Sequence, residues 1–201
     1  MTDCLIAGVG GQGTVLASRL ISSAALARGL DVRGAETIGM AQRGGSVLSH
    51  VRMGRDIKSP LISPGRADVV LAFELCEAAR ASGYLKRDGL MVACDRVIQP
   101  ASGYDPDAMR ALLEASVPRL LILKSGAIGA ACGIRALNTA IIGAACARGA
   151  FPFSIGDMEK IIDERFDADG SRMNRAALRL GETLAAAGED REGRGERHGD
   201  D

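Results

Sequence analysis

The feature that most constrains the fold lies at the start of the chain, where residues 4–13 read CLIAGVGGQG. A short, continuously apolar run that ends in glycines is typical of a parallel strand buried on both faces and followed by a tight turn. The next segment, TVLASRLISSAALARG, repeats Leu16, Leu20 and Ala24 at four-residue steps and reaches Gly29, which suits a left-handed helix end. These residues predict a strand–turn–helix unit.

Strand patterns and helix patterns continue to alternate after this unit. Strand patterns cover residues 31–36, 46–53, 67–74, 89–95 and 119–126, and helix patterns cover residues 76–85, 135–149, 154–166 and 171–188. Ser154 and Asp157 form a capping-box pattern at the start of one helix. The alternation predicts an α/β fold with an open, mostly parallel, Rossmann-like sheet and additional C-terminal helices.

The strand pattern at residues 46–53 also predicts a hairpin excursion. It ends in a turn at Gly54, Arg55 and Asp56, and an apolar arm follows at residues 57–62. Prolines at 60 and 64 place this second arm at a sheet edge or outside the sheet, because proline cannot donate to a ladder.

Length and composition indicate a single domain. The chain has 201 residues, of which 47% are hydrophobic, and this is enough for one core over residues 1–187. The last 14 residues, GEDREGRGERHGDD, are all glycine, charged or histidine. Because such a segment buries too little apolar area to offset its chain entropy, residues 188–201 are predicted to be a disordered charged tail.

Charge and cysteine usage exclude several classes of partner. Lys plus Arg equals Asp plus Glu at 25 each, so we expect no binding to nucleic acid or to an anionic membrane. No apolar run approaches the roughly 20 residues of a membrane span, and no charged leader precedes the first strand, so the expected location is cytoplasmic. The cysteines are odd in number and form no C-x-x-C pair, which predicts reduced thiols and no metal site: Cys4, Cys76, Cys94, Cys132 and Cys146.

The glycine turn predicts an anion site. Gly8, Gly10 and Gly13 fit G-x-G-x-x-G between a strand and a helix, where backbone amides and the helix N-terminus favour a pyrophosphate. Glycines that only allow close packing are the alternative interpretation. Glu36, 23 residues after Gly13, suits the ribose of a nicotinamide cofactor and keeps a stand-alone NAD(P)-dependent oxidoreductase open. No Ser/Tyr/Lys or His/Asp set for hydride transfer accompanies it.

A second glycine-rich stretch, GMAQRGGSVLSHVR, covers residues 39–52. Its glycines predict a sharp loop with Gln42 and Arg43 at an exposed apex, where a forked guanidinium suits a carboxylate or phosphate. His50 on the following strand is either a site residue or a structural hydrogen-bond partner. Because the stretch has no base beside a nucleophile, no paired carboxylates and no metal spacing, it resembles a docking or ligand-shaping loop more than a complete catalytic centre.

Four segments carry a family resemblance: GVGGQGTVLASRL, GMAQRGGSVLSHVRMG with SPLI behind it, ADVVLAFELCEA and ALNTAIIGA. Together they strongly resemble the beta subunits of indolepyruvate:ferredoxin oxidoreductases and, more broadly, the gamma subunits or domains of 2-oxoacid:ferredoxin oxidoreductases. The resemblance extends from Cys4 to about Gly188.

The resemblance implies a subunit that is not active alone. Its partner would be a larger alpha subunit that carries thiamine diphosphate, magnesium and iron–sulfur clusters, with none of these bound by this chain alone. The holoenzyme would convert an arylpyruvate and the co-substrate coenzyme A into an acyl-CoA and pass electrons to ferredoxin. The sequence agrees, since it has neither a cysteine quartet for a cluster nor a G-D-G…N pattern for a magnesium diphosphate.

The resemblance also implies site residues. Residues expected to face the phosphates of coenzyme A are Gly8, Gly10, Gly11, Gln12 and Gly13. Residues expected at the subunit interface near the thiamine site are Gln42, Arg43, Gly44 and Gly45, with Asn138 assisting from its helix. A third interpretation is a non-catalytic assembly module, because the small-residue stretch SGAIGAACG allows close packing against another chain, although it equally allows tight internal packing.

Overall fold

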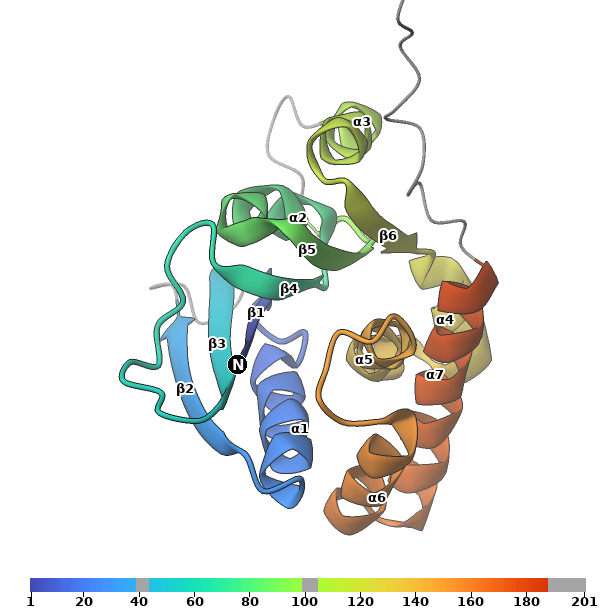
Figure 1. Cartoon of the computed structure of the whole chain (residues 1–201). Coiled ribbons are helices and arrows are strands. Elements are labelled where there is room, and N and C mark those ends of the chain that lie inside the picture. Colours follow the sequence, from blue (N-terminus) through green and yellow to red (C-terminus); the bar gives the residue numbers. More distant parts are fainter. Residues whose placement is uncertain (39–43, 99–104, 188–201) are drawn as a thin grey trace, which may run out of the picture.

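The computed structural model describes residues 1–38, 44–98 and 105–187. A single six-stranded sheet lies between two layers of helices, with α1, α4, α5, α6 and α7 on one side and α2 and α3 on the other (Figure 1). A buried apolar cluster fills each side: one includes Leu20, Ile21 and Ile141, and the other includes Leu75 and Leu113. The expected α/β class is confirmed.

The sheet has the order β2-β3-β1-β4-β5-β6. Its strands are β1 (Thr2–Val9), β2 (Asp31–Ile38), β3 (Ser46–Gly54), β4 (Ala67–Ala72), β5 (Leu85–Cys94) and β6 (Arg119–Leu123). Strands β1, β4, β5 and β6 pair in parallel, whereas β3 pairs antiparallel with both β1 and β2. The sheet is therefore mostly parallel and open, as predicted.

The hairpin excursion differs from its prediction in which segments pair. β3 forms an antiparallel pair with β2, which precedes it, and residues 57–62 form no strand. These residues run outside the sheet, in agreement with the prolines at 60 and 64, and contact its face through two side chains of β3. The backbone N–H of Ile62 donates to His50 Nδ1 at 3.1 Å, and Arg52 donates to the carbonyl oxygen of Ser59 at 3.1 Å.

The helices are α1 (Thr14–Ala27), α2 (Leu75–Ala81), α3 (Pro106–Ser116), α4 (Ser125–Cys132), α5 (Leu137–Ala147), α6 (Ile155–Arg165) and α7 (Ala168–Ala187). The capping box at Ser154 and Asp157 is present at the start of α6. Helix α3 was not predicted, although Asp105 caps its N-terminus and Pro106 lies in its first turn, which is a helix-start pattern. The end of the predicted strand 119–126 belongs to α4, since the strand ends at Leu123.

Helices α5 and α7 touch through their backbones. A Cβ at Gly143 would collide with the Leu178 carbonyl, and a Cβ at Gly181 would collide with the Ala140 carbonyl. Tight internal packing of small residues thus occurs here rather than on α4, where Ile128 is the one buried residue of the helix and Gly126, Ala127 and Ala130 are exposed.

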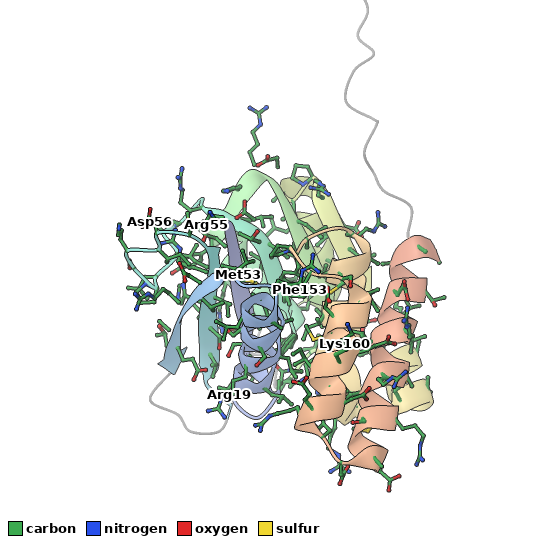
Figure 2. The ribbon with its side chains drawn as sticks, turned by 60° about the horizontal axis from the view of Figure 1, so that its bottom comes forward. Arg19, Met53, Arg55, Asp56, Phe153 and Lys160 are labelled. Atoms are coloured by element: carbon green, nitrogen blue, oxygen red, sulfur yellow. The ribbon has the colours of Figure 1, made fainter. Side chains whose placement is uncertain are left out.

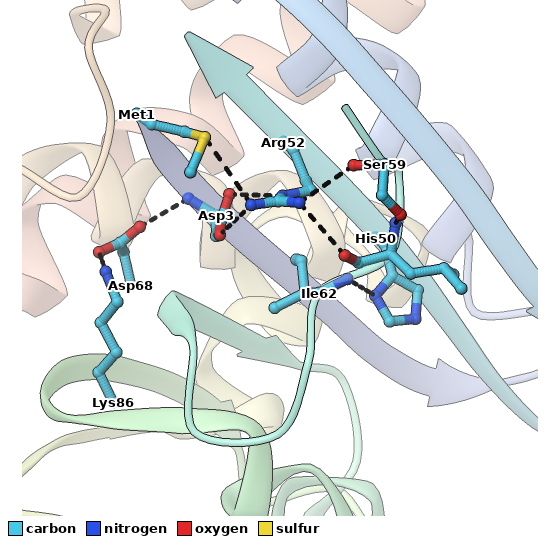
Figure 3. A network of polar contacts seen from close by, with 9 residues as sticks. Met1, Asp3, His50, Arg52, Ser59, Ile62, Asp68 and Lys86 are labelled. Carbon is cyan, nitrogen blue, oxygen red and sulfur yellow. Dashed lines mark hydrogen bonds and ion pairs between the residues drawn. The ribbon is translucent and has the colours of Figure 1, made fainter. Parts of the chain in front are cut away.

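A polar cluster holds the amino edge of the parallel strands together (Figure 3). Arg52 donates to both carboxylate oxygens of Asp3, at 2.9 and 3.0 Å, and the backbone N–H of Asp3 donates to Asp68. Lys86 pairs with the same Asp68. Arg52 also donates to the carbonyl oxygens of residues 59 and 61. The SHVR segment (residues 49–52) and the SPLI segment (residues 59–62) are therefore held together at the amino edge of the sheet by structural contacts.

Candidate functional site

The glycine turn lies at the carboxyl edge of the sheet, between the ends of β1 and β4, and the helices that follow these two strands leave a crevice there. The helix that follows β1 packs with the core cluster on one face, and the helix that follows the neighbouring β4 packs with the cluster on the other face. Strands whose following helices diverge in this way form a topological switch point, at which α/β proteins commonly bind ligands. The candidate site is therefore the edge between β1 and β4.

The turn requires glycine at two places for different reasons. Gly13 has φ +83°, and a Cβ there would lie 2.7 Å from Asn138 Nδ2. Gly11 has φ +97° but is exposed, with open space where a Cβ would stand. Gly13 is also the N-cap of α1 and provides no side-chain cap, so the first backbone N–H groups of α1 have no intrahelical or side-chain partner. These amides can receive an anion.

Two of the residues expected to face phosphates hold the turn itself. The Gln12 side chain accepts from the Val9 backbone N–H at 2.6 Å and donates to the Phe73 carbonyl at 3.0 Å. It thereby joins the ends of β1 and β4. The Gly10 N–H donates to the Gly45 carbonyl at 2.9 Å. The amides left for a ligand are those that follow Gly10, at Gly11, Gly13 and the start of α1.

Asn138 supports the turn from inside the protein. It is buried, at 2% exposure, and donates from Nδ2 to the Gly13 carbonyl at 3.4 Å. Its Oδ1 accepts from the Thr139 N–H, and the Thr139 hydroxyl donates to Asn174 of α7 at 2.7 Å. Asn138 therefore affects the glycine turn indirectly, by its hydrogen bond to the Gly13 carbonyl.

The structure adds a buried carboxylate pair that the sequence interpretation missed. Glu74 and Glu77, at 1% and 2% exposure, lie at the start of α2. Glu74 accepts from the backbone N–H of Glu77 at 2.9 Å, and Glu77 accepts from the Ser46 hydroxyl at 2.5 Å and from Arg80. Burial raises the pKa of the Glu74 carboxyl, although backbone N–H donors oppose this shift. An acid at the end of the strand pattern 67–74, with a second acid three residues later, was the available signal.

His50 and the apex residues stand apart from this site. His50 is 5% exposed, accepts from Ile62, and packs edge-on to Tyr84 with ring centroids 6.1 Å apart. Burial lowers its pKa, and these contacts give it a structural role. Gln42 and Arg43 lie outside the described residues. Gly44, with φ +79°, and Gly45 lead into β3 beside the glycine turn.

The position of Glu36 argues against a nicotinamide site. β2, which carries Glu36, is separated from β1 by the antiparallel β3. Two interstrand spacings amount to about 10 Å, whereas the dinucleotide fold places the acidic strand next to the first strand. Glu36 instead accepts from Ser18 of α1 at 3.3 Å.

A surface hollow of about 670 Å³ lies beside α1. Six of its lining residues are polar or charged side chains of α1, β2 and α6: Ser18, Arg19, Ser22, Ser23, Glu36 and Arg165. In the described part of the chain, neither Arg19 nor Arg165 forms an ion pair. Figure 2 shows Arg19 well apart from the Arg55–Asp56 turn. The hollow begins at Ser18, about one helical turn after the start of α1 at Thr14, and two guanidinium groups line it.

Residues 1–38, 44–98 and 105–187 contain neither a group of metal ligands nor a single helix that could span a membrane. No three side chains of His, Cys, Asp or Glu are grouped there as a metal ion would require, and the five cysteines are free thiols. Burial raises the pKa of Cys94 to about 11. No single helix in these ranges is long and apolar enough to cross a membrane, and only a strongly bent pair, residues 125–132 with 134–147, meets the criterion of length and composition.

Comparison with known proteins gives a consistent result. The family model described as pyruvate ferredoxin/flavodoxin oxidoreductase matches residues 3–184. Subunit IorB of indolepyruvate oxidoreductase from Archaeoglobus fulgidus is 36% identical over 194 residues, which cover 92% of this chain and 96% of that protein. The IorB subunit from Thermococcus kodakarensis is 34% identical over 89% of this chain and 93% of its own length.

Solved structures share the fold. The gamma subunit of a keto/oxoacid ferredoxin oxidoreductase from Geobacter sulfurreducens matches with a TM-score of 0.66 at 23% identity and covers 94% of this chain and all of that one. The 2-oxoglutarate:ferredoxin oxidoreductase from Magnetococcus marinus, solved with 2-oxoglutarate, coenzyme A and succinyl-CoA bound, matches with a TM-score of 0.71 at 20% identity. That match covers 94% of this chain and 32% of the larger one.

Proposed function

Because the chain belongs to the pyruvate ferredoxin/flavodoxin oxidoreductase family, we propose that it is the subunit without thiamine diphosphate of a 2-oxoacid:ferredoxin oxidoreductase. The holoenzyme decarboxylates a 2-oxo acid oxidatively, transfers the acyl group to coenzyme A and passes electrons to ferredoxin. Thiamine diphosphate, magnesium and iron–sulfur clusters reside on a larger partner subunit. We expect the assembly to work in the cytoplasm, where these substrates are found.

The substrate that we propose is indolepyruvate or another arylpyruvate. The observation that carries this choice is the identity of 36% and 34% to two subunits named for indolepyruvate oxidoreductase, each matched over about nine tenths of its length. The two solved structures, named for keto/oxoacids and for 2-oxoglutarate, share less than 25% identity with this chain and support only the fold.

The contribution of this chain is a binding wall for coenzyme A. The amides of Gly11 and Gly13 and of the first turn of α1 point from a helix N-terminus, which favours a pyrophosphate. Gly8, Gly10 and Gln12 shape this turn from behind, through close packing and the hydrogen bonds to Gly45 and Phe73. Arg19 and Arg165 in the neighbouring hollow are suited to a further phosphate.

The second part of the proposal concerns the subunit interface. Gln42, Arg43, Gly44 and Gly45 line the face toward the partner near its thiamine site, and Asn138 contributes by supporting Gly13. Arg43→Ala is expected to lower holoenzyme turnover or assembly while the chain still folds. Unchanged turnover and assembly would remove Arg43 from the site.

The decisive test is purification of the chain with its partner from the native cell. We expect a brown complex that reduces a one-electron acceptor only when both an arylpyruvate and coenzyme A are present. Parallel assays with indolepyruvate, phenylpyruvate, pyruvate and 2-oxoglutarate give the substrate order, and a preference for pyruvate or 2-oxoglutarate would refute the arylpyruvate assignment. Recovery of a colourless, isolated chain with NAD-linked activity would overturn the whole proposal.

A further inference from the structure

We propose that Glu77 and Ser46 are positioning residues for the glycine turn, and that they act through a closed ring of contacts at the carboxyl edge of the sheet. The ring consists of Gly10, Gln12, Gly45, Ser46, Phe73, Glu74 and Glu77, and we call it the carboxyl-edge ring. The inference rests on the proposed function in one respect, namely that the turn binds coenzyme A.

The carboxyl-edge ring can be followed from the turn to β3 and on to α2. The Gly10 N–H donates to the Gly45 carbonyl at 2.9 Å, and Gly45 is bonded to Ser46, the first residue of β3. The Ser46 hydroxyl donates to Glu77 Oε2 at 2.5 Å. The turn and the buried carboxylate of α2 are thus joined by two hydrogen bonds and one peptide link.

The ring then returns to the turn along the other side of the crevice. The Glu77 N–H donates to Glu74 Oε2 at 2.9 Å, and Glu74 is bonded to Phe73 at the end of β4. The Phe73 carbonyl accepts from the Gln12 side chain at 3.0 Å, two residues after Gly10. Three segments that are far apart in the sequence are therefore held in one closed circuit around the switch point.

Because Glu77 is buried, its carboxylate requires hydrogen-bond donors from the rest of this ring. Its side chain is 2% exposed, whereas that of Arg80, its cationic partner, is 67% exposed. A buried carboxylate is stable only when its oxygens are hydrogen-bonded, and Ser46 and Arg80 each take one oxygen. Ser46 is consequently fixed where Glu77 needs it, and the Gly45 carbonyl is fixed with it.

The position of Gly45 determines which amides of the turn are available. Because its carbonyl captures the Gly10 N–H, that amide points into the ring, and the positive φ of Gly11 and Gly13 directs the rest of the turn outward. Glu77 is too buried to touch coenzyme A. Its effect on the reaction should therefore be on the affinity for coenzyme A and not on the rate of the chemical steps.

Three variants of the full chain, each assembled with its partner, test this inference. Ser46→Ala removes one hydrogen bond of the ring, and Glu77→Gln keeps the shape of the side chain and removes its charge. Ser82→Ala is the matched control, because the Ser82 hydroxyl donates to the Ala79 carbonyl at 2.7 Å at the far end of the same helical segment. Each variant is measured for hydrogen exchange of the peptide containing Gly10 to Thr14, for the KM of coenzyme A, for kcat and for Tm.

Ser46→Ala is expected to speed exchange at Gly10 and to raise the KM for coenzyme A, each by about fivefold, as loss of one hydrogen bond implies. The value of kcat should stay within about twofold, and Tm should fall no further than in Ser82→Ala. Glu77→Gln should change the same quantities in the same direction but less, since the amide oxygen can still accept from Ser46.

The other outcomes overturn the inference in distinguishable ways. If exchange and KM in Ser46→Ala match those of Ser82→Ala, Ser46 does not position the turn. If exchange rises while the KM for coenzyme A is unchanged, the ring exists but the turn is not the coenzyme A site, and the proposed role of the turn fails. If kcat and Tm fall together with the rise in KM, the ring is only a structural support.

Discussion

The side-chain amide of Asn138 lies directly behind Gly13, with Nδ2 2.7 Å from the point where a Cβ of residue 13 would stand. The same amide donates to the Gly13 carbonyl at 3.4 Å. A residue buried in α5 thus determines both the size and the conformation that are permitted at the N-cap of α1. The glycine turn is held from below by α5 and from the side by the carboxyl-edge ring.

Gly13→Ala should destabilise the fold by about 2–4 kcal/mol, because a Cβ at φ +83° is strained and also collides with Asn138. Asn138→Ala removes the obstacle but not the strain. Urea unfolding of the two single variants and the double variant gives the coupling between them. The double variant should be less destabilised than the sum of the singles, and strict additivity would contradict the contact.

Gly143→Ala and Gly181→Ala should each destabilise the fold by about 3 kcal/mol or more, since a methyl group at either position meets a backbone carbonyl of the facing helix. Gly126→Ala on exposed α4 is the matched control, because no atom lies within 4 Å of its added Cβ. It should be neutral or slightly stabilising through helix propensity. Thermal unfolding of the three variants checks this order.

Arg52→Ala should destabilise the chain by about 3 kcal/mol, because the side chain of Asp3 is only 5% exposed and would be left without its cation. The same change releases the carbonyls of residues 59 and 61. Limited trypsin digestion should then cut faster after Lys58. Lys58→Ala, which removes an exposed pair with Asp56, should change the unfolding free energy little, and equal losses in both variants would contradict the assignment.

Arg179→Ala should weaken the dependence of stability on acid pH. The Arg179 guanidinium beside Glu159 lowers the pKa of that carboxyl in the folded state. A folded pKa below the unfolded value stabilises the protein above about pH 4.3, and this contribution is lost as the pH falls through the folded pKa. Urea unfolding at pH 6 and pH 3.5 should show a smaller difference in the variant. An unchanged difference would mean that the pair contributes nothing.

The double variant Arg19→Ala/Arg165→Ala should raise the KM for coenzyme A by about tenfold or more, since each guanidinium can donate a charge-assisted hydrogen bond to a phosphate. The KM for the 2-oxo acid should not change. Arg55→Ala, which lies apart from Arg19, serves as the control (Figure 2). A KM for coenzyme A equal to that of the control would remove the hollow from the coenzyme A site.

Patterns within single segments of the sequence predicted the individual strands and helices that they cover. The apolar run before Gly8 and the four-residue repeat after Gly13 predicted β1 and α1, and Ser154 with Asp157 predicted the start of α6. The insertion of β3 between β1 and β2 was not predictable in this way, because strand pairing depends on segments about 45 residues apart. Helix α3 was missed although Asp105 and Pro106 mark its start, and only one of its side chains, Leu113, is buried.

In the candidate site, too, contiguous features were predictable and contacts between distant segments were not. The turn and its glycines follow from the sequence, since strand, glycine and helix signals are contiguous there. The inward orientation of Gln12 does not follow, because its partner Phe73 lies 61 residues away. Glu74 and Glu77 are visible in the sequence, but their burial and the contact of Glu77 with Ser46 arise only when the sheet has folded.

The insertion of β3 also affects the order in which the chain can fold during its synthesis. β1 is made before both of its sheet neighbours, which are β3, ending at Gly54, and β4, ending at Ala72. Until residue 72 has left the ribosome, this strand has apolar faces and unpaired backbone groups on one or both edges. The nascent chain is therefore most prone to misassociation during this interval, when chaperone binding to β1 would be most useful.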